Sequence, residues 1–582
     1  MIPSFNELKK AAKQSGEGMK TIRFAVVGDC ATQHVSTALR GYAHTVGYHL
    51  DLFDADYNQL DAQTMDPGSE LYAHAPAFTL LYNCTEKLYE SYASLPMEER
   101  SNFAERTYAA IAGRWERISS FISTRILQTN FPEEDDRVFG SYAFKVPGAF
   151  INQVRKLNVL LAEGTQSHKN VFIADAAGLR NELGRDGFAD PGLYYLAKLP
   201  MKTDALPLFA KSVLDTVSAA EGRFHKCAVL DLDNTLWGGV IGDDGLEGIA
   251  VGELGTGHAF TDLQRWLKEL RERGVILAVC SKNNEDTAKE PFEKHPEMVL
   301  RLSDISMFVA NWEDKATNIR RIQSTLNIGM DSMVFLDDNP FERNLVRSLI
   351  PEITVPELPE DPAEYLSYLR SLNLFETASY SGEDRERTAQ YQAEIGRAAL
   401  MDQFADFDEY LKSLEMVAKA APFDKFSYPR VSQLTQRSNQ FNLRTVRYTE
   451  SEIGEIAESD RFLTLYFTLR DKFGDHGLIS VVILEKKENK TLFVHEWLMS
   501  CRVLKRGMEE FIVNTILETA AENGFETVTA EYLKTPKNAM VKDIYSRLGF
   551  TVTGEEGENR TYSVSVSSFV PNKTLITRET QE

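Results

Sequence analysis

The sequence predicts a multidomain α/β protein in which two domains with parallel sheets precede an α+β domain. Between residues 21 and 372, short apolar runs end in polar residues and are followed by segments of helical periodicity. Beyond about residue 376 the apolar runs lie closer together, as antiparallel strands do. The length of 582 residues allows three or four domains at roughly 150 residues each.

The composition is that of a folded, acidic protein. Apolar residues make up 43% of the chain and charged residues 26%, which provides a core and excludes global disorder. The formal net charge of −22 argues against nucleic acid as a partner, because nucleic-acid binding needs a basic face. No apolar run approaches about 18 residues, so we expect no membrane span.

The termini and cysteines indicate a cytoplasmic protein. Residues 1–20, an N-terminal extension, lack the apolar stretch of a signal peptide. The five cysteines are an odd number, widely spaced and without a C-x-x-C pair. Free thiols in a reducing cytosol are the simplest interpretation.

Residues 21–215 are predicted to form the first α/β domain, with a flavodoxin-like sheet. Apolar runs at 22–27, 78–81, 122–127 and 171–174 each lead into polar residues. The first ends in Gly28-Asp29-Cys30, which resembles the Gly-Asp-Ser block of SGNH hydrolases with Cys30 in the nucleophile position. Cys30 precedes a predicted helix, whose N-terminus would lower its pKa. The alternatives for Cys30 are a thiol that carries an acyl group and a small residue that ends a strand.

Residues 220–372 are predicted to form the second α/β domain. The apolar residues 228–230 read as a buried strand that ends at Asp231, with Asp233 two positions later. Two carboxylates at this spacing would crowd like charges on one face of a strand, so Asp231 is placed at the strand end. Two more strands end at Ser281 and at Asp337-Asp338, and Lys315 lies near the start of a helix.

These four segments, in this order, resemble motifs I to IV of the haloacid-dehalogenase-like (HAD) phosphotransferases. The resemblance implies that Asp231 is a nucleophile and Asp233 a general acid and base. It also implies Mg²⁺ held by Asp231, the backbone carbonyl of Asp233, and Asp338, which aligns with the metal carboxylate in preference to Asp337. The phosphate-binding residues expected here are Asn234, Thr235, Ser281, Lys282, Asn283 and Lys315. Residues 237–242 look like a short flap, and no large cap domain is expected.

Residues 376–582 resemble a GNAT acyltransferase domain. Arg502, Arg506 and Gly507 precede an amphipathic helix and fit the loop R/Q-x-x-G-x-G/A, which binds the pyrophosphate of acyl-CoA. Lys505 stands where the first glycine of that loop is expected, and its side chain would hinder close approach of the phosphates. Asn538 and Tyr545 lie in the segment that matches the closing motif, with Tyr545 in the general-acid position. Acyl-CoA is therefore the second cofactor to consider.

The order of the three domains resembles the FkbH-like proteins, HAD subfamily IIIC. That resemblance implies transfer of a glyceryl group from 1,3-bisphosphoglycerate to a carrier-protein thiol, with loss of phosphate. The implied partners are a phosphorylated small molecule and an acyl carrier protein. Three cysteines lie beside predicted sites, and the sequence does not choose among them as an acyl carrier: Cys30, Cys280 and Cys501.

Three classes of function remain open at this point. The first is a Mg²⁺-dependent HAD-type phosphatase or acyl-phosphate transferase. The second is an acyl-CoA-dependent acyltransferase with an accessory phosphatase domain, against which Lys505 weighs. The third is a scaffold that docks a carrier protein, against which the complete set of HAD motifs weighs.

Overall fold

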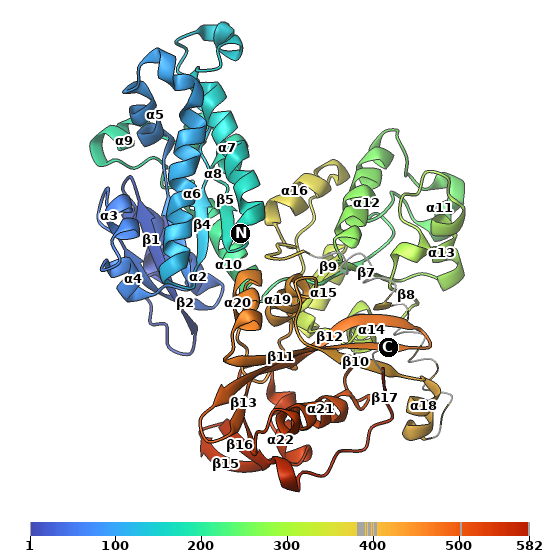
Figure 1. Ribbon diagram of the computed structural model, residues 1–582. Coiled ribbons are helices and arrows are strands. Elements are labelled where there is room, and N and C mark those ends of the chain that lie inside the picture. Colours follow the sequence, from blue (N-terminus) through green and yellow to red (C-terminus); the bar gives the residue numbers. More distant parts are fainter. Residues whose placement is uncertain are drawn as a thin grey trace. The chain divides into compact units, whose positions relative to one another are not determined.

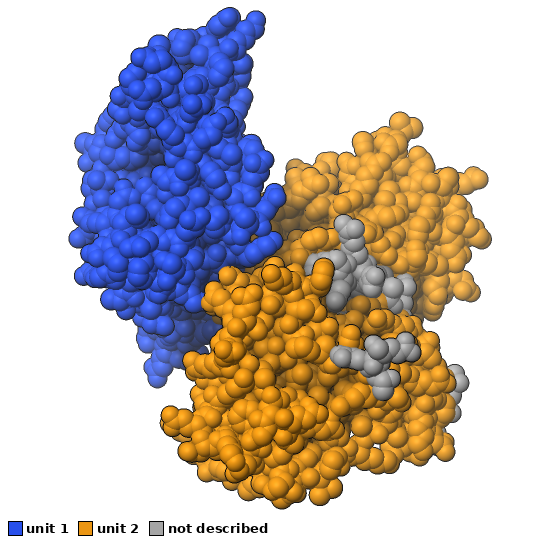
Figure 2. All heavy atoms as spheres, in the orientation of Figure 1, with its two compact units in different colours: residues 1–217 blue, residues 218–582 orange. Residues whose placement is uncertain are grey.

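The computed structural model describes residues 2–380, 406–500 and 503–579, together with a few residues between 390 and 404. It divides into two compact units, Met1–Val217 and Ser218–Glu582 (Figure 2). None of the described helices is long and apolar enough to cross a membrane. The prediction of a multidomain α/β protein is confirmed, and each unit is described in turn.

The first unit contains one five-stranded parallel sheet with the order β2-β1-β3-β4-β5 (Figure 1). This is the flavodoxin-like order, in which polar residues at the carboxyl ends of the central strands share one edge. The strands are β1 (Lys20–Gly28), β2 (Tyr48–Asp54), β3 (Phe78–Tyr82), β4 (Arg125–Thr129) and β5 (Val171–Ala174). The longer helices are α2 (Gln33–Thr45), α5 (Thr85–Ala93), α6 (Phe103–Phe121), α7 (Phe150–Ser167), α8 (Ala176–Phe188) and α10 (Leu206–Ala220).

The second unit begins with a four-stranded parallel sheet of order β8-β7-β6-β9. Alternate residues of β6 enter two different apolar clusters, Ala228 and Leu230 on one face and Cys227 and Val229 on the other. Because both faces are buried under helices, the strand reads as a continuous apolar run. Its strands are β6 (Cys227–Leu230), β7 (Ile276–Ser281), β8 (Met307–Ala310) and β9 (Met333–Leu336). Its helices include α11 (Ile241–Gly248), α12 (Thr256–Glu272), α13 (Glu285–Lys294), α14 (Lys315–Leu326), α15 (Pro340–Leu349) and α16 (Tyr365–Leu372).

An eight-stranded sheet of order β15-β16-β14-β13-β12-β11-β10-β17 forms the rest of the second unit. One face packs on α21 (Met508–Glu522) and α22 (Ile544–Arg547), and the other on α19 (Tyr428–Arg437) and α20 (Glu450–Glu458). The strands are β10 (Val417–Ala421), β11 (Phe462–Asp471), β12 (Gly474–Lys487), β13 (Thr491–Met499), β14 (Thr527–Tyr532), β15 (Thr551–Glu556), β16 (Asn559–Ser565) and β17 (Thr577–Arg578). This mixed sheet with helices on both faces is an α+β domain, as the sequence predicts for this part of the chain.

The parallel strands β13 and β14 pair only at Thr491–Val494 and Thr527–Ala530, and then separate. The segment 441–443 lies along the released part of β13. Met499 N donates to Phe441 O at 3.0 Å, and Leu443 N donates to Trp497 O at 3.2 Å. On its other side, Leu533 N donates to Leu443 O at 2.9 Å. The chain itself therefore satisfies backbone groups that the separation of the two strands exposes.

Glu496 is a carboxyl group buried in β13, and it makes the stability of this domain depend on pH. Its oxygens accept from Val446 N at 3.1 Å and from Trp497 N at 3.2 Å, and its side chain is fully buried. Burial raises its pKa from 4.5 to about 7. Because the unfolded chain ionises first, stability is lost as the pH rises from 4.5 to 7.

We expect Glu496→Gln to remove this pH-dependent loss of unfolding free energy. The full pKa shift of Glu496 corresponds to about 3 kcal/mol. In thermal unfolding, the Tm of the variant relative to that of the wild type should rise between pH 5 and pH 8. Glu488→Gln, at an exposed turn, is the matched control and should follow the wild type. A Glu496→Gln curve parallel to the wild type would mean that Glu496 does not titrate in this window.

Candidate functional site

The four-stranded sheet gathers acidic and basic side chains at its carboxyl edge. Asp231 follows β6, Ser281 ends β7 and Asp337 follows β9, while Lys315 is the first residue of α14 beyond β8. Neighbouring parallel strands end at the same edge, so residues far apart in the sequence meet there. The structure thus brings Asp231, Ser281, Lys315 and Asp338 to one edge of the sheet.

A buried ammonium group lies between two carboxylates at this edge. Lys315 Nζ is 2.9 Å from Asp231 Oδ2 and 2.5 Å from Asp337 Oδ2, and all three side chains are buried. Burial raises the pKa of Asp231 and of Asp337, and the Lys315 charge opposes the rise. Burial also works against the Lys315 charge, but the two carboxylates outweigh it and raise the pKa of Lys315. The group is held together by charge in a site with little access to water.

Three carboxylates are close enough to share one cation. Oxygens of Asp231, Asp337 and Asp338 all lie within 4.8 Å of one another. Lys315 neutralises one of these negative charges when all three are ionised, and two remain. Hard oxygen donors with excess negative charge fit Mg²⁺. Asp337 also belongs to this group, whereas the sequence analysis selected only Asp338 as a metal ligand. The position of Asp337 directly after an apolar strand could have indicated its place in the site.

Asp233 faces the flap that follows β6. Its Oδ1 accepts from Trp237 Nε1 and from Ile241 N, each at 3.0 Å. Its Oδ2 accepts from Asn283 Nδ2 at 2.8 Å, and the same amide is 3.3 Å from Ser281 Oγ. The carboxylate of Asp233 is therefore fixed by the flap and by the loop after β7. It is absent from the carboxylate cluster. Metal binding by its backbone carbonyl remains a prediction.

Three further residues expected to bind phosphate also contact other protein groups. Asn234, in the left-handed region at φ 55°, is exposed and its Oδ1 accepts from Gly239 N at 2.9 Å. Thr235 Oγ1 accepts from Asp338 N at 3.1 Å. Lys282 Nζ lies 2.6 Å from Glu342 Oε1. In this conformation Asn234 and Thr235 shape the loop after β6, and Lys282 neutralises a buried carboxylate.

Arg343 is a residue that the sequence reasoning missed. Its guanidinium is buried and donates from Nη1 to the backbone oxygens of Asp337, at 2.8 Å, and Asp338, at 2.5 Å. It thereby holds the turn that presents both carboxylates. The only signal in the sequence is its place in the first turn of the helix after Pro340, where many arginines are simply solvated.

The expected lowering of the Cys30 pKa is wrong. The side chain of Cys30 is buried, and burial, followed by the neighbouring Cys84 thiol, raises its pKa well above the ordinary value. The helix α2 begins at Gln33 after Thr32, so Cys30 lies outside its first turn. Cys280 is also buried, its Sγ is 3.7 Å from Lys315 O, and burial raises its pKa. Cys501 lies outside the described residues.

Among the described acyl-CoA residues that the sequence predicts, Arg506 and Asn538 are buried. Arg506 Nη1 points inward, 3.7 Å from Asp471 Oδ2. Asn538 is fully buried and closes its own loop, donating to Asn442 O and Leu533 O at 2.9 Å. Gly507, at φ 83°, caps α21, and Arg502 lies outside the described residues.

Tyr545 is also not placed where a general acid would act. It is 1% exposed and packs against the rings of Trp497, Phe550 and Tyr562. Burial raises the pKa of its hydroxyl well above the usual value. The matching sequence segment therefore contributes Tyr545 to the core of the domain, because the short helix α22 packs its apolar side against the sheet.

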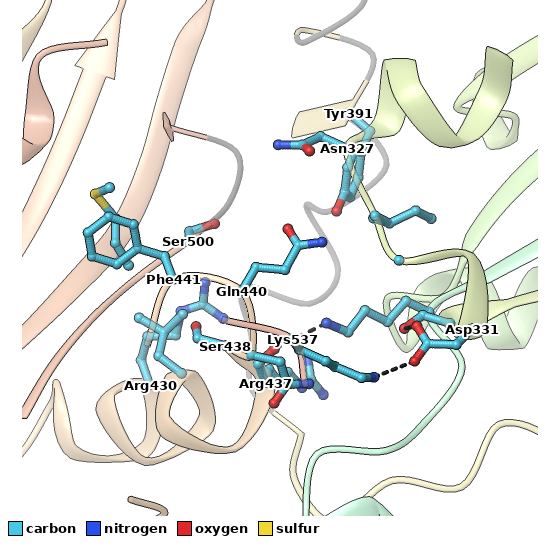
Figure 3. Close-up of a pocket in the computed structure, with 17 residues that line it drawn as sticks. Asn327, Asp331, Tyr391, Arg430, Arg437, Ser438, Gln440, Phe441, Ser500 and Lys537 are labelled. Atoms are coloured by element: carbon cyan, nitrogen blue, oxygen red, sulfur yellow. Dashed lines mark hydrogen bonds and ion pairs between the residues drawn. The ribbon is translucent and has the colours of Figure 1, made fainter. Parts of the chain in front are cut away.

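Figure 3 shows a cavity of about 230 Å³ in the second unit. Because residues before β9 line it, it lies at the opposite end of the four-stranded sheet from Asp231, which follows β6. It is bounded by residues 327–332, which precede β9, and by residues of the C-terminal domain around Gln440. The Lys537–Asp331 ion pair crosses it, and Lys226 Nζ donates to Arg437 O at 3.1 Å. These contacts join the two domains of the second unit, and the cavity is remote from the carboxylates.

Comparison with known proteins agrees with this description. Residues 23–218 match the family described as FkbH, N-terminal domain. The N-terminal part of the protein BF1531 from Bacteroides fragilis, which contains a phosphatase domain and was solved in complex with Mg, is 48% identical. That match covers 65% of this chain and 100% of the solved chain, with a TM-score of 0.63.

Two acetyltransferase structures match a smaller part of the chain. The ribosomal-protein-S18-alanine N-acetyltransferase from Escherichia coli is 13% identical and covers 27% of this chain and 99% of its own, with a TM-score of 0.21. The GNAT domain of S. lividans PAT is 15% identical and covers 25% and 89%, also with a TM-score of 0.21. At this level the matches say nothing about what the domain binds. No curated protein matches the chain.

The fold and the carboxylate site define an enzyme of the HAD-like hydrolase and phosphotransferase class. With 48% identity over the whole of the solved chain, the protein belongs to the same family as BF1531.

Proposed function

We propose that this protein is a Mg²⁺-dependent HAD-type phosphatase or acyl-phosphate transferase that acts through Asp231. The observation that supports this most is the cluster of Asp231, Asp337 and Asp338 around the Lys315 ammonium at the carboxyl edge of a parallel sheet. A nucleophilic carboxylate, a fixed cation and further carboxylates for a metal ion are the groups that phosphoryl transfer through an aspartyl phosphate requires.

In the proposed reaction an oxygen of Asp231 attacks phosphorus, and the bond from phosphorus to the leaving oxygen breaks. Asp233 would give a proton to that oxygen and later take one from the water that hydrolyses the aspartyl phosphate. Lys315 would offset the charge on the transferring group, with Ser281 and Asn283 as hydrogen-bond donors to its oxygens. Mg²⁺, held by Asp231, Asp338 and the backbone carbonyl of Asp233, would neutralise carboxylate and phosphate charge.

For the substrate we propose a phosphorylated small molecule, and more narrowly an acyl phosphate with a glyceryl-like acyl group. In this narrower reaction a thiolate would attack the acyl carbon and the bond from that carbon to the phosphate oxygen would break. The acyl group would then be held as a thioester on the way to a carrier-protein thiol, and inorganic phosphate would leave, whereas attack by Asp231 on phosphorus describes the phosphatase reaction. The match of residues 23–218 to the FkbH N-terminal domain supports this narrower proposal. The cysteine that would hold the acyl group is left open, because burial raises the pKa of both Cys30 and Cys280.

The proposal is tested by incubating the purified chain with Mg²⁺ and 1,3-bisphosphoglycerate, and measuring released phosphate and the intact mass. A plain phosphatase gives phosphate with no lasting adduct. An acyl transferase gives in addition a mass gain that hydroxylamine removes, and peptide mapping then locates it. If none of a panel of acyl phosphates and phosphomonoesters gives phosphate release that EDTA abolishes, the proposed function is wrong.

The second candidate is an acyl-CoA-dependent acyltransferase in the C-terminal domain, which its GNAT-like sheet favours. Such a domain needs an opening between β13 and β14 for the amide-bearing arm of CoA. In this protein the segment 441–443 makes the backbone hydrogen bonds where these two strands separate. Lys505, at φ 61°, also places a side chain in the loop before α21. We therefore expect isothermal calorimetry to detect no binding of acetyl-CoA at millimolar concentration. Binding that Gly507→Asp weakens would instead support this candidate.

A further inference from the structure

The first unit holds a group of acidic side chains that the proposed phosphatase chemistry leaves unused. Asp29 and Cys30 follow β1, and Cys84 follows β3, its hydrogen-bonded neighbour, with Gly28 opposite Tyr82. A carboxylate oxygen of Asp29 and the Sγ atoms of Cys30 and Cys84 all lie within 4.8 Å of one another. Cys30 is 1% exposed and Cys84 4%. Two thiols and a carboxylate therefore converge on one small volume.

The carboxylate of this group is oriented by a chain of hydrogen bonds. Asp29 Oδ2 accepts from Asn83 Nδ2 at 2.7 Å, and its Oδ1 accepts from Cys84 N at 3.1 Å. Asn83 Oδ1 in turn accepts from Gln128 Nε2 at 2.9 Å, and Gln128 Oε1 accepts from Trp115 Nε1 at 3.1 Å. Supporting hydrogen bonds of this kind fix the direction of a ligand and sharpen the geometry of metal sites.

The electrostatic surroundings of the thiols are acidic. Burial is the largest cause that raises the pKa of Cys30. The neighbouring acids Cys84, Asp29 and Glu86 raise it further. Burial likewise raises the pKa of Asp29 and of Glu86. Several acidic groups packed together are stable only if protons or a cation neutralise their negative charge. A cation that prefers sulfur would bind the deprotonated thiols and replace those protons.

A cavity of about 510 Å³ in the first unit reaches Cys84. Cys84 and Glu86 line it, together with the rings of Tyr82, Tyr89 and Tyr194. The cavity provides a path for an ion and room for water as a further ligand. A site with three protein ligands and one open position is the arrangement that zinc enzymes keep for reactivity.

We propose that Asp29, Cys30 and Cys84 form a binding site for one sulfur-preferring divalent cation of the Zn²⁺ class. Binding would release one proton from each thiol and form two metal–sulfur bonds, with one metal–oxygen bond to Asp29. Zinc–sulfur bonds of about 2.3 Å and zinc–oxygen bonds of about 2.1 Å require ligand atoms roughly 3.5 Å apart. The three ligand atoms here already lie within 4.8 Å of one another. Thiolate ligands select such ions over the Mg²⁺ that the oxygen-rich site in the second unit fits.

The test uses Co²⁺ as a probe on the full-length, reduced, metal-free protein. Co²⁺ bound to thiolates gives an intense near-ultraviolet charge-transfer band, whereas Co²⁺ at the Asp231 carboxylates gives none. We expect this band to saturate at one equivalent, to disappear on addition of Zn²⁺, and to persist in Asp231→Asn. Cys30→Ser and Cys84→Ser should each bind the thiolate-site Co²⁺ at least 100-fold more weakly.

Cys227→Ala, which removes another buried thiol, is the matched control and should keep the band. Circular dichroism checks that the serine variants fold, and the wild-type titration decides the matter even if they do not. No charge-transfer band from the wild type at millimolar Co²⁺ would overturn the proposal. Rapid formation of a Cys30–Cys84 disulfide under mild oxidant, with no metal uptake by the reduced protein, would also overturn it and make the pair a redox couple.

Discussion

Replacing Asp231 by Asn should abolish Mg²⁺-dependent phosphate release, with a loss of at least 1,000-fold, and should leave the protein folded. An amide is a poor nucleophile and a weaker metal ligand, and no aspartyl phosphate forms without the carboxylate. The substitution also removes one negative charge from a crowded group, so the stability of the second unit should not fall greatly. Phosphate release with a substrate accepted by the wild type, at equal protein concentration, is the measurement.

The matched control is Asp243→Asn in the exposed first turn of α11, which should retain full activity. A folded Asp231→Asn protein that keeps more than a tenth of wild-type turnover would exclude Asp231 as the nucleophile. Asp337, the other carboxylate that contacts Lys315, would then be the next position to test.

Lys315→Met should be the more damaging of the two substitutions for stability, and it should also lower activity. It removes the buried cation between Asp231 and Asp337 and leaves their charges uncompensated, which costs about 3 kcal/mol or more. Phosphate release should fall at least 100-fold, because no ammonium then balances the transferring group. Thermal unfolding with and without Mg²⁺ should show a larger stabilisation by Mg²⁺ in the variant, since the metal becomes the main neutralising charge.

Lys289→Met provides the comparison on a neighbouring helix. Lys289 pairs with Glu285 on the surface of α13, 2.5 Å apart, and a pair of this kind contributes less than about 1 kcal/mol. Equal destabilisation by the two substitutions would show that Lys315 has no special electrostatic role.

The positions of the site residues along the chain could be predicted because each follows or precedes a strand of the parallel sheet. The apolar runs before Asp231, Ser281 and Asp337 are buried on both faces, so their ends are visible in the sequence. The side-chain directions could not be predicted in the same way. Asp233 turns toward Trp237 and Asn283, and Lys282 toward Glu342, because of partners that are distant in sequence or lie on another element.

Burial was the second property that the sequence did not reveal. The position of Cys30 before a predicted helix suggested a lowered pKa. Cys30 is buried beside other acidic groups, and burial raises its pKa instead. The segment that carries Tyr545 matches an acyltransferase motif, yet its ring completes an aromatic core. Local patterns indicate which element a residue belongs to, whereas its exposure depends on what packs over that element.

The three hydrogen bonds of Asp233 have a consequence for how a proton reaches it. Oδ1 already accepts from the backbone N–H of Ile241 and the indole N–H of Trp237. A proton would therefore reside on Oδ2, which faces Asn283 Nδ2 in this structure. An O–H on Oδ2 could donate to the amide oxygen of Asn283 once the amide turns over. We therefore expect the orientation of the Asn283 amide to follow the proton on Asp233. A half-turn of one side chain would accompany each proton exchange, while the flap keeps its hold on the other oxygen.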